Sequence, residues 1–252
     1  MFSSAKRFFL AASGLIVVLV IWYAVYSLGL YNILLVPSPF EVFTALINFL
    51  TDKEFLLNLV ATLARITTAF AVSAAVGISA GLLFGYYNLL DNATKKLVDF
   101  WRSVPGIVLF PLFILLCGIG NISRLLTAIF VAIPIILINT KYGVLNSNRL
   151  RKNFSKIYKI SSIRMFYKVI LPEASPYIFT GAKVALSLII ILIIVTEMLV
   201  GTKYGLGHLL IISQYQFDTA AMYALIIVLG MIGLMLNSSF DEIEKKVFHW
   251  RQ

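Results

Sequence analysis

The segment YIFTGAKVALSLIIILIIVTEMLV, residues Tyr177–Val200, is long and apolar enough to cross a lipid bilayer as a single helix. Only Lys183 and Glu197 interrupt it with a charge. A helix pairs all of its backbone polar groups internally, which lipid requires of any spanning segment. We therefore expect an all-α membrane protein built around this segment.

Similar apolar runs occur on both sides of this segment, and the chain as a whole is 60% hydrophobic, 13% charged and has a mean hydropathy of +0.94. The other predicted spans are Phe8–Leu30, Leu56–Tyr86, Val98–Leu116, Leu125–Tyr142 and Thr219–Leu236. The first run is too long for a signal peptide and has no clear cleavage site, so we expect it to be retained. The sequence predicts six transmembrane helices in a single membrane domain, residues 1–252.

Basic residues cluster on one side of these spans. The connection between the fourth and fifth spans carries eight of them and no acidic residue: Lys141, Arg149, Arg151, Lys152, Lys156, Lys159, Arg164 and Lys168. Further basic residues precede the first span, follow the second and follow the last, whereas the opposite loops carry only Lys53, Lys203 and Arg124. Cytoplasmic loops are rich in Lys and Arg, so both termini should be cytoplasmic. The excess of basic residues on cytoplasmic loops accounts for the net charge of +10, so the charge does not require a nucleic-acid partner.

Two outer segments have local structural signals. Ser38-Pro39-Phe40-Glu41 has the pattern of a capping box with proline at the first helical position, which predicts a short helix from Pro39 to about Leu50. The glycine-rich segment Gly201–His208 predicts a turn, followed by a second short helix that ends before Asp218.

Three glycines in the second span, Gly77, Gly81 and Gly85, recur every four residues. This spacing places them on one helix face, where another helix backbone can approach closely. We interpret them as helix-packing residues.

Two ionisable residues, Arg65 and Glu197, lie within spans at similar depth near the outer side. A charge at such a position normally faces protein or water, because lipid disfavours it. The pair could be a structural bridge between helices, a gate or contact along the transport pathway, or two snorkelling side chains. We select both as candidate pathway or gate residues, and we expect Lys183 and Arg102 to snorkel.

Prolines interrupt two of the predicted spans, and several catalytic motifs are absent from the sequence. Pro105, Pro111 and Pro134 interrupt the third and fourth spans, and kinks of this kind often border a cavity, so we expect the pathway beside spans three to five. The sequence has no nucleotide-binding phosphate loop or serine nucleophile elbow. His208 and His249 are isolated, and Cys117 is the one cysteine. We expect no catalytic residues, no metal site and no cofactor on this chain.

The basic connection also contains apolar residues at helical spacing, which predicts short amphipathic helices. A charge run is often only a solvated face that attracts anionic lipid headgroups. Exposed apolar side chains on such a loop instead favour a partner surface.

The segment Lys168–Tyr177, together with Thr196–Leu199 and Gly205-Leu206-Gly207, resembles the permease subunits of ATP-binding-cassette importers, in particular the nitrate/sulfonate/taurine type. Shorter fragments match the same group in order along nearly the whole chain: Val36–Pro39, Thr62–Arg65, Ser103–Pro105, Phe110–Leu112, Gly118–Gly120 and Ile138–Thr140.

The resemblance implies a type I importer permease fold with a core domain over about residues 56–240. It also implies several partners: a second permease subunit, with a homodimer preferred over a heterodimer, two cytoplasmic ATP-binding subunits that hold ATP and Mg²⁺, and an extracytoplasmic substrate-binding protein. The chain itself would be a multi-pass protein of the inner membrane of a prokaryote. The coupling region would be residues 146–166. Our candidate contacts to the ATPase are Arg149, Arg151, Phe154, Tyr158, Ile160, Ile163 and Phe166.

The sequence departs from the family pattern at one place. Aligned on Leu171-Pro172, the turn glycine of the family's cytoplasmic motif is replaced by Lys159, and the acidic start of that motif is missing near Asn153. The resemblance leaves the solute open among nitrate, sulfonates, taurine, bicarbonate and vitamin precursors. The alternatives to an importer permease are a secondary transporter and a membrane scaffold without transport.

Overall fold

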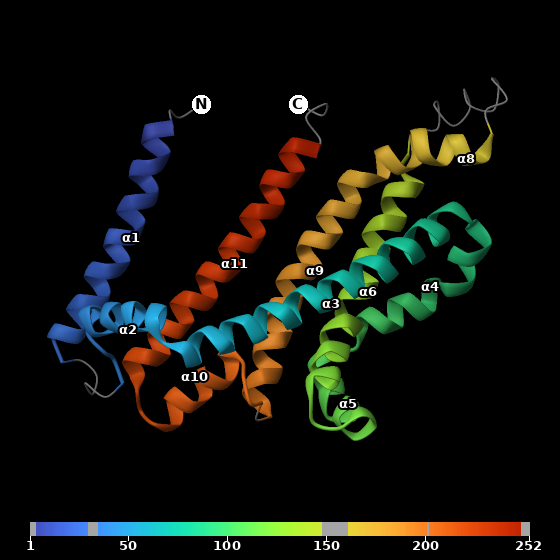
Figure 1. The fold of residues 1–252 in the computed structure, drawn as a ribbon. Coiled ribbons are helices and arrows are strands. Elements are labelled where there is room, and N and C mark those ends of the chain that lie inside the picture. The colour runs from blue at the N-terminus through green and yellow to red at the C-terminus, as the bar shows by residue number, and fades with distance from the viewer. Residues whose placement is uncertain (1–3, 30–34, 148–160, 201, 248–252) are drawn as a thin grey trace.

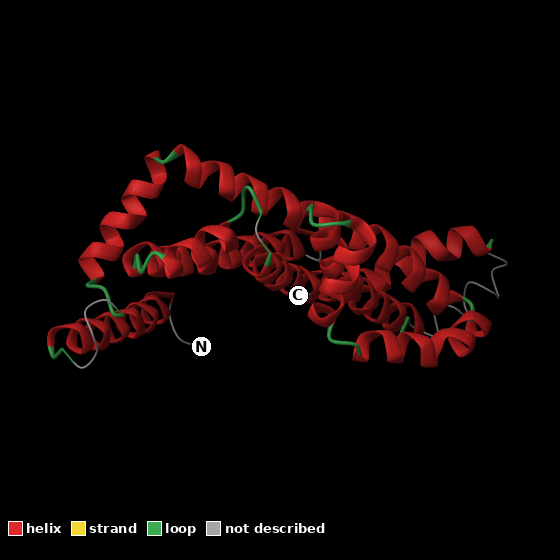
Figure 2. Cartoon of the chain, turned by 90° about the horizontal axis from the view of Figure 1, so that it is seen from below, coloured by secondary structure: helices red, strands yellow, loops and turns green. Residues whose placement is uncertain are grey.

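The computed structural model describes residues 4–29, 35–147, 161–200 and 202–247, and within these ranges helices are the regular secondary structure, joined by short turns and loops (Figures 1 and 2). Three helices form its centre: α3 (Lys53–Tyr86), α6 (Asn121–Leu145) and α9 (Leu171–Leu199). Aliphatic side chains from all three fill the space between them. The most deeply buried of these include Ile66, Ala132, Ile136, Ile189 and Ile193.

Close contact between α3 and α6 depends on small residues. A Cβ atom added to Gly77, Gly81 or Gly85 would lie 2.8, 2.5 or 2.6 Å from the nearest side-chain atom of α6. All three glycines therefore face α6, along one line of contact. In lipid, where no hydrophobic force drives helices together, such close packing supplies much of the association.

The predicted span Val98–Leu116 is not a continuous helix. Instead, α4 (Asn88–Ser103) ends before Pro105, and a 3₁₀ turn, η1 (Gly106–Leu109), leads into α5 (Phe110–Cys117). The two halves are bent by 85°. Pro105 has no N–H to continue the ladder and forces the preceding Val104 into an extended conformation (φ −78°, ψ 120°). Pro134, by contrast, lies inside α6, which continues past it.

Four described helical segments are long and apolar enough to cross a membrane, or five if the bent pair is one span. They are Lys53–Tyr86, Asn121–Leu145, Ser162–Leu199 and Thr219–Val247. The third combines α8 (Ser162–Met165), a π-helical turn η2 (Phe166–Ile170) and α9. The predicted first span corresponds to α1 (Ser4–Ser27), whose described apolar part, Ile16–Ser27, is shorter than a span. The predicted total of six therefore stays a prediction.

Helix α1 stands apart from the central helices in Figure 1, and Trp22 is one of the residues through which it contacts the rest of the molecule. Trp22 Nε1 donates a hydrogen bond of 3.1 Å to the carbonyl oxygen of Pro37, and its ring stacks on Tyr223 at 5.7 Å. Tyr223 belongs to the last helix, α11 (Thr219–Val247).

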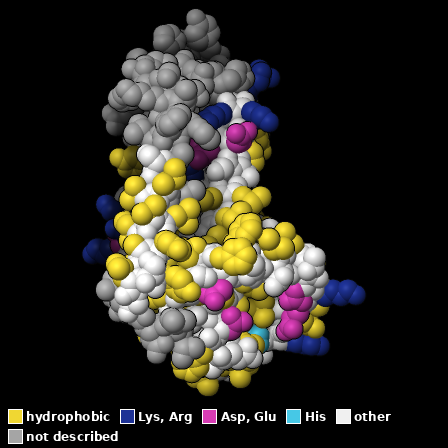
Figure 3. All heavy atoms as spheres, turned by 90° about the vertical axis from the view of Figure 1, so that its left-hand side faces the viewer, with side chains coloured by type: hydrophobic (Ala, Val, Ile, Leu, Met, Phe, Trp, Pro, Cys, Tyr) yellow, Lys and Arg dark blue, Asp and Glu magenta, His cyan; other side chains and the backbone are white. Residues whose placement is uncertain are grey.

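Both predicted short helices are present. Helix α2 (Pro39–Thr51) begins with the expected capping box, in which Ser38 Oγ accepts the N–H of Glu41 at 3.2 Å and Glu41 Oε2 accepts the N–H of Ser38 at 2.8 Å. Helix α10 (Leu206–Tyr215) ends before Asp218. In Figure 1, α2 and α10 lie at one end of the molecule, and α8 lies at the other end, with the start of α1 and the end of α11. Hydrophobic side chains dominate the middle of the face in Figure 3.

Candidate functional site

Arg65 and Glu197, selected from the sequence by their depth, are in direct contact. Arg65 projects from α3 and Glu197 from α9, and Arg65 Nη1 donates to Glu197 Oε1 in a buried ion pair. Arg65 is 7% exposed and Glu197 is completely buried. Removing one partner from such a pair would leave an uncompensated charge inside the protein.

The carboxylate of Glu197 is also held by groups from two other segments. Thr62 Oγ1 donates to Oε2 at 2.9 Å, and the backbone N–H of Gly207 donates to the same oxygen at 3.0 Å. A buried carboxylate with several donors is well satisfied, so the Glu197 carboxylate is fixed in position.

The beginning of α10 is capped by side chains of α3 and α9 instead of by its own residues. Asn58 Oδ1 accepts the N–H of Gly205, Thr62 Oγ1 accepts that of Leu206 at 2.8 Å, and Glu197 accepts that of Gly207. The first N–H groups of a helix have no partner within the helix, and a negative charge there is favourable. Helix α10 is thus attached through its N-terminus to α3 and α9.

Glycine is required where α10 begins, because the charged pair approaches its backbone closely. A Cβ atom on Gly205 would lie 2.6 Å from Glu197 Cδ and 2.9 Å from Arg65 Nη1. Any larger side chain at Gly205 would have to displace the ion pair.

Arg65 extends the cluster to the remaining core helix. Its Nε donates to Asn121 Oδ1 of α6 at 2.9 Å, and its Nη2 donates to Thr202 Oγ1 at 3.2 Å. Arg124, 2% exposed on α6, donates from Nη2 to the carbonyl oxygen of Val200 at 2.9 Å. The cluster therefore joins α3, α6, α9 and α10. We call the set Asn58, Thr62, Arg65, Asn121, Arg124 and Glu197 the outer polar cluster.

Sequence reasoning identified only the ion pair of this cluster. Arg124 was assigned to an outer loop, whereas it lies in the first turn of α6. Asn58 and Thr62 were not selected as site residues, although Asn58, Thr62 and Arg65 follow one another at intervals of four and three residues in an apolar run. That spacing places them on one helix face and could have indicated their common environment.

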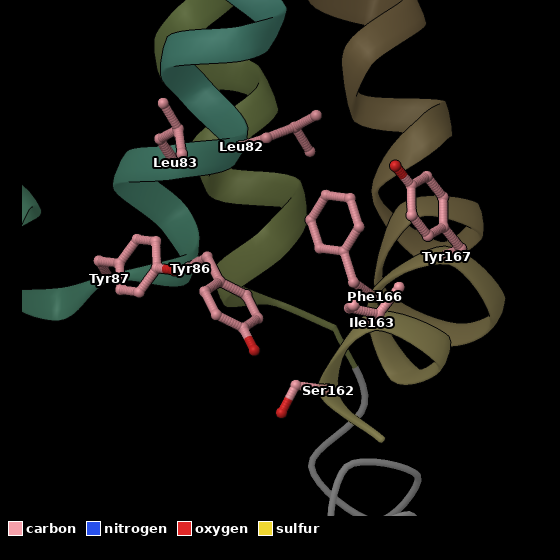
Figure 4. A pocket seen from close by; sticks show the side chains of 8 residues that line it. All are labelled: Leu82, Leu83, Tyr86, Tyr87, Ser162, Ile163, Phe166 and Tyr167. Atoms are coloured by element: carbon pink, nitrogen blue, oxygen red, sulfur yellow. The ribbon is translucent and has the colours of Figure 1, made fainter. Parts of the chain in front are cut away.

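A second candidate site lies at the opposite end of the molecule, where α8 and η2 meet the end of α3 (Figure 4). A cavity of about 320 Å³ opens there between aromatic and aliphatic side chains. Its lining residues are Leu82, Leu83, Tyr86, Tyr87, Ser162, Ile163, Phe166 and Tyr167. Phe166 meets Tyr86 edge to face at 6.0 Å, whereas Ile163 is 74% exposed.

Most of the predicted ATPase contacts lie outside the described residues. Residues 148–160 are not described, and this range contains Arg149, Arg151, Phe154, Tyr158 and Ile160, as well as Lys159. Ile163 and Phe166 are described, and both line the cavity at the α8 corner.

The two remaining charged residues behave differently from each other. Lys183, expected to snorkel, donates instead from Nζ to Asp241 Oδ1 of α11. Arg102 lies at the exposed end of α4, and its Nε is 3.5 Å from Asp99 Oδ1.

Among the described residues no group of three or more His, Cys, Asp or Glu side chains could hold a metal ion.

Comparisons with known proteins agree with this architecture. The family model described as "Binding-protein-dependent transport system inner membrane component" matches residues 73–249. The nitrate import permease protein NrtB of Leptolyngbya laminosa is 30% identical over 197 residues, covering 78% of this chain and 70% of that protein. The bicarbonate transport system permease protein CmpB of Synechocystis is 26% identical over 245 residues, covering 93% and 86%.

A solved structure supports the fold directly. The inward-facing MetNI methionine ABC transporter contains a chain that superposes with a TM-score of 0.67 at 20% identity, over 78% of this chain and 99% of that one. The helical architecture is thus the type I importer permease fold. With the family model matching most of the sequence, the chain belongs to the inner membrane components of binding-protein-dependent transport systems and is the permease of an ATP-binding-cassette importer.

Proposed function

We propose that this chain forms one half of the solute pathway of an importer whose ATP hydrolysis takes place on separate subunits. One observation carries the proposal: Ser162–Leu199 is a continuous helical stretch of 38 residues that links the α8 corner to Glu197. Within this stretch, α9 alone has 29 residues and is about 44 Å long at 1.5 Å per residue. Because a helix is stiff along its axis, a push on the corner reaches the outer polar cluster.

The α8 corner, within the coupling region 146–166, is the proposed contact with the ATPase. Ile163 is 74% exposed beside an apolar cavity, and large apolar side chains in such a position fit a protein partner. The residues proposed for this contact remain Arg149, Arg151, Phe154, Tyr158, Ile160, Ile163 and Phe166.

Arg65 and Glu197 are the proposed outer gate. They act by holding α10 against α3 and α9, since both side chains are buried among protein groups rather than facing a solute. Opening the outer end of the pathway would then require α10 to move together with these helices, or the cluster to exchange partners.

The remaining partners follow from the family. We propose a second copy of this chain as the other pathway subunit, two ATP-binding subunits, and an extracytoplasmic binding protein, all at the inner membrane of a prokaryote. Helix α11 buries only 11% of its most apolar stretch within the chain, which leaves surface for lipid and for a second subunit. The solute is proposed to be small and polar. Anions such as nitrate, bicarbonate and sulfonates are the first to test, and vitamin precursors the next.

Reconstitution tests the proposed division of labour. Vesicles that contain this chain, its ATPase and its binding protein should accumulate solute against a gradient when ATP is supplied on the ATPase side. Vesicles that contain only this chain should accumulate none. Uphill accumulation by the chain alone, or uptake that is indifferent to ATP, would contradict the proposal.

A single substitution tests the coupling contact. Ile163→Asp places a charge on an exposed position, so the fold should be unaffected while the affinity for the ATPase falls about tenfold or more. Tyr215→Asp is the matched control, because Tyr215 is 77% exposed at the opposite end of the molecule. Equal retention of the ATPase by both variants in a detergent pull-down would exclude the α8 corner.

A further inference from the structure

Two polar contacts lie in register between α9 and α11. Lys183 pairs with Asp241, and one helical turn further along each helix Ser187 Oγ donates to Asn237 Oδ1 at 3.3 Å. The two helices run in opposite directions, so advancing four residues on α9 matches going back four on α11. We call these four residues the α9–α11 polar seam.

The seam lies within the membrane-spanning part of both helices. Each helix has 29 residues, or about 44 Å, which exceeds the roughly 30 Å of hydrocarbon in a bilayer. Asn237 is ten residues, about 15 Å, from the last residue of α11, well inside a centred 30 Å layer. Polar groups at this depth normally face protein or water.

Within the part of the chain that the structure describes, protein covers one side of the seam. Leu236 and Phe240, the neighbours of Asn237 and Asp241, pack on the α3–α6–α9 core, and Phe240 meets Phe70 edge to face at 5.3 Å. The charged side chains are not enclosed in the same way, since Lys183 is 37% and Asp241 is 44% exposed. The seam therefore forms the rim of the α9–α11 contact and opens away from the core.

The chemistry of the open side requires water. An ammonium group has three hydrogen-bond donors and is strongly hydrated. Among the described residues, the ammonium group of Lys183 has one acceptor, the carboxylate of Asp241. Lipid tails offer no acceptor for the other donors. Snorkelling explains a single long side chain that reaches the membrane surface. It does not explain a row of two charged and two neutral polar groups that extends over a helical turn.

We propose that the α9–α11 polar seam lines the water-filled inner part of the solute pathway. This inference rests on the proposed function, because a hydrated surface within a permease is part of its pathway. A small polar solute would pass hydrogen-bonding groups of both kinds there: donors on Lys183 and Ser187, and acceptors on Asn237 and Asp241.

Cysteine labelling in the assembled transporter tests the proposal. In a Cys117→Ala background, Ser187→Cys and Asn237→Cys are exposed to a charged, membrane-impermeant methanethiosulfonate on the cytoplasmic side of inside-out vesicles. Glu242→Cys, near the end of α11, is the water-exposed control. Leu234→Cys, 70% exposed on the apolar part of α11, is the lipid-facing control.

Thiols in water ionise and react, whereas thiols in lipid do not. Ser187→Cys and Asn237→Cys should therefore react within about tenfold of the Glu242→Cys rate, and about a hundredfold faster than Leu234→Cys. Reaction no faster than at Leu234→Cys would overturn the proposal. Labelling needs no transport, so an uptake assay on the same vesicles separates failure of this inference from failure of the importer function.

Discussion

Thr62 Oγ1 lies 2.9 Å from Glu197 Oε2, although the two residues are 135 positions apart in the sequence. Thr62 Oγ1 also accepts the backbone N–H of Leu206 at 2.8 Å. One hydroxyl group thus donates to α9 and accepts from α10 while it is carried by α3. It is the smallest group in the outer polar cluster that joins three helices.

Replacing Thr62 by valine should weaken this junction at nearly constant volume. The variant leaves the N–H of Leu206 and one carboxylate oxygen without their hydroxyl partner, at a cost of about 1–3 kcal/mol. Thr62→Ser keeps the hydroxyl and is the control. Thermal unfolding in detergent should show a lower midpoint for Thr62→Val than for Thr62→Ser. Identical midpoints would mean that the hydroxyl contributes nothing to the attachment of α10.

The ion pair predicts an unusual order among variants. Arg65→Met leaves the buried carboxylate of Glu197 without its cation, at a cost of about 3–5 kcal/mol. The double variant Arg65→Met/Glu197→Leu removes both charges and should therefore be more stable than Arg65→Met alone. Thermal midpoints of the three proteins provide the comparison. A double variant less stable than the single one would show that hydrogen bonds to α10, rather than the charge balance, dominate.

Local signals predicted local structure well. The capping box at Ser38 and Glu41 needs only residues that are three positions apart, and it formed as expected. Pro105 marked an interruption in the third span, but the 85° bend between α4 and α5 was not predictable from it. A proline removes a donor and restricts its neighbour, while the direction of the chain beyond it depends on what the next helix packs against.

Long-range polar contacts were harder to predict. Arg65 and Glu197 stood out because a charge is rare in an apolar run, and similar depth suggested that they could meet. Asn58 and Thr62 are polar but uncharged, so nothing in composition separated them from residues that bond to their own helix. Their partners are backbone N–H groups at Gly205 and Leu206, and backbone groups have no sequence signature.

Close packing of α3 on α6 makes a matched pair of glycine substitutions informative. A Cβ atom on Gly81 would lie 2.5 Å from Thr140 Cβ and 2.7 Å from the carbonyl oxygen of Leu137, both on α6. Gly81→Ala should therefore force the helices apart and cost about 1–3 kcal/mol. Gly230 of α11 has nothing within 4 Å of the same position.

Gly230→Ala is the control, since alanine there gains helix propensity without a clash. Thermal unfolding in detergent should show a lower midpoint for Gly81→Ala and an unchanged or higher one for Gly230→Ala. If both substitutions shift the midpoint equally, the line of glycines on α3 does not set the distance to α6.

The hairpin of α3 and α4 is tied to α6 by an ion pair between Asp91 and Lys141. Lys141 Nζ lies 2.6 Å from Asp91 Oδ1, and the two side chains are only 15% and 20% exposed. The pair Asp99–Arg102 within α4 is an internal comparison, because it is 3.5 Å long and its side chains are more than half exposed. Burial reduces the screening of a charge pair by salt, whereas exposed pairs are screened strongly.

Double-mutant cycles should separate the two pairs. With Asp91→Asn and Lys141→Met we expect a coupling energy of about 1–3 kcal/mol that persists in high salt. With Asp99→Asn and Arg102→Met we expect about 0.3 kcal/mol, falling towards zero as salt is added. Thermal unfolding in detergent at low and high salt measures both. A coupling at Asp91–Lys141 that vanishes with salt would mean that this pair is as hydrated as the exposed one. The hairpin would then be attached to α6 mainly by the glycine contacts of α3.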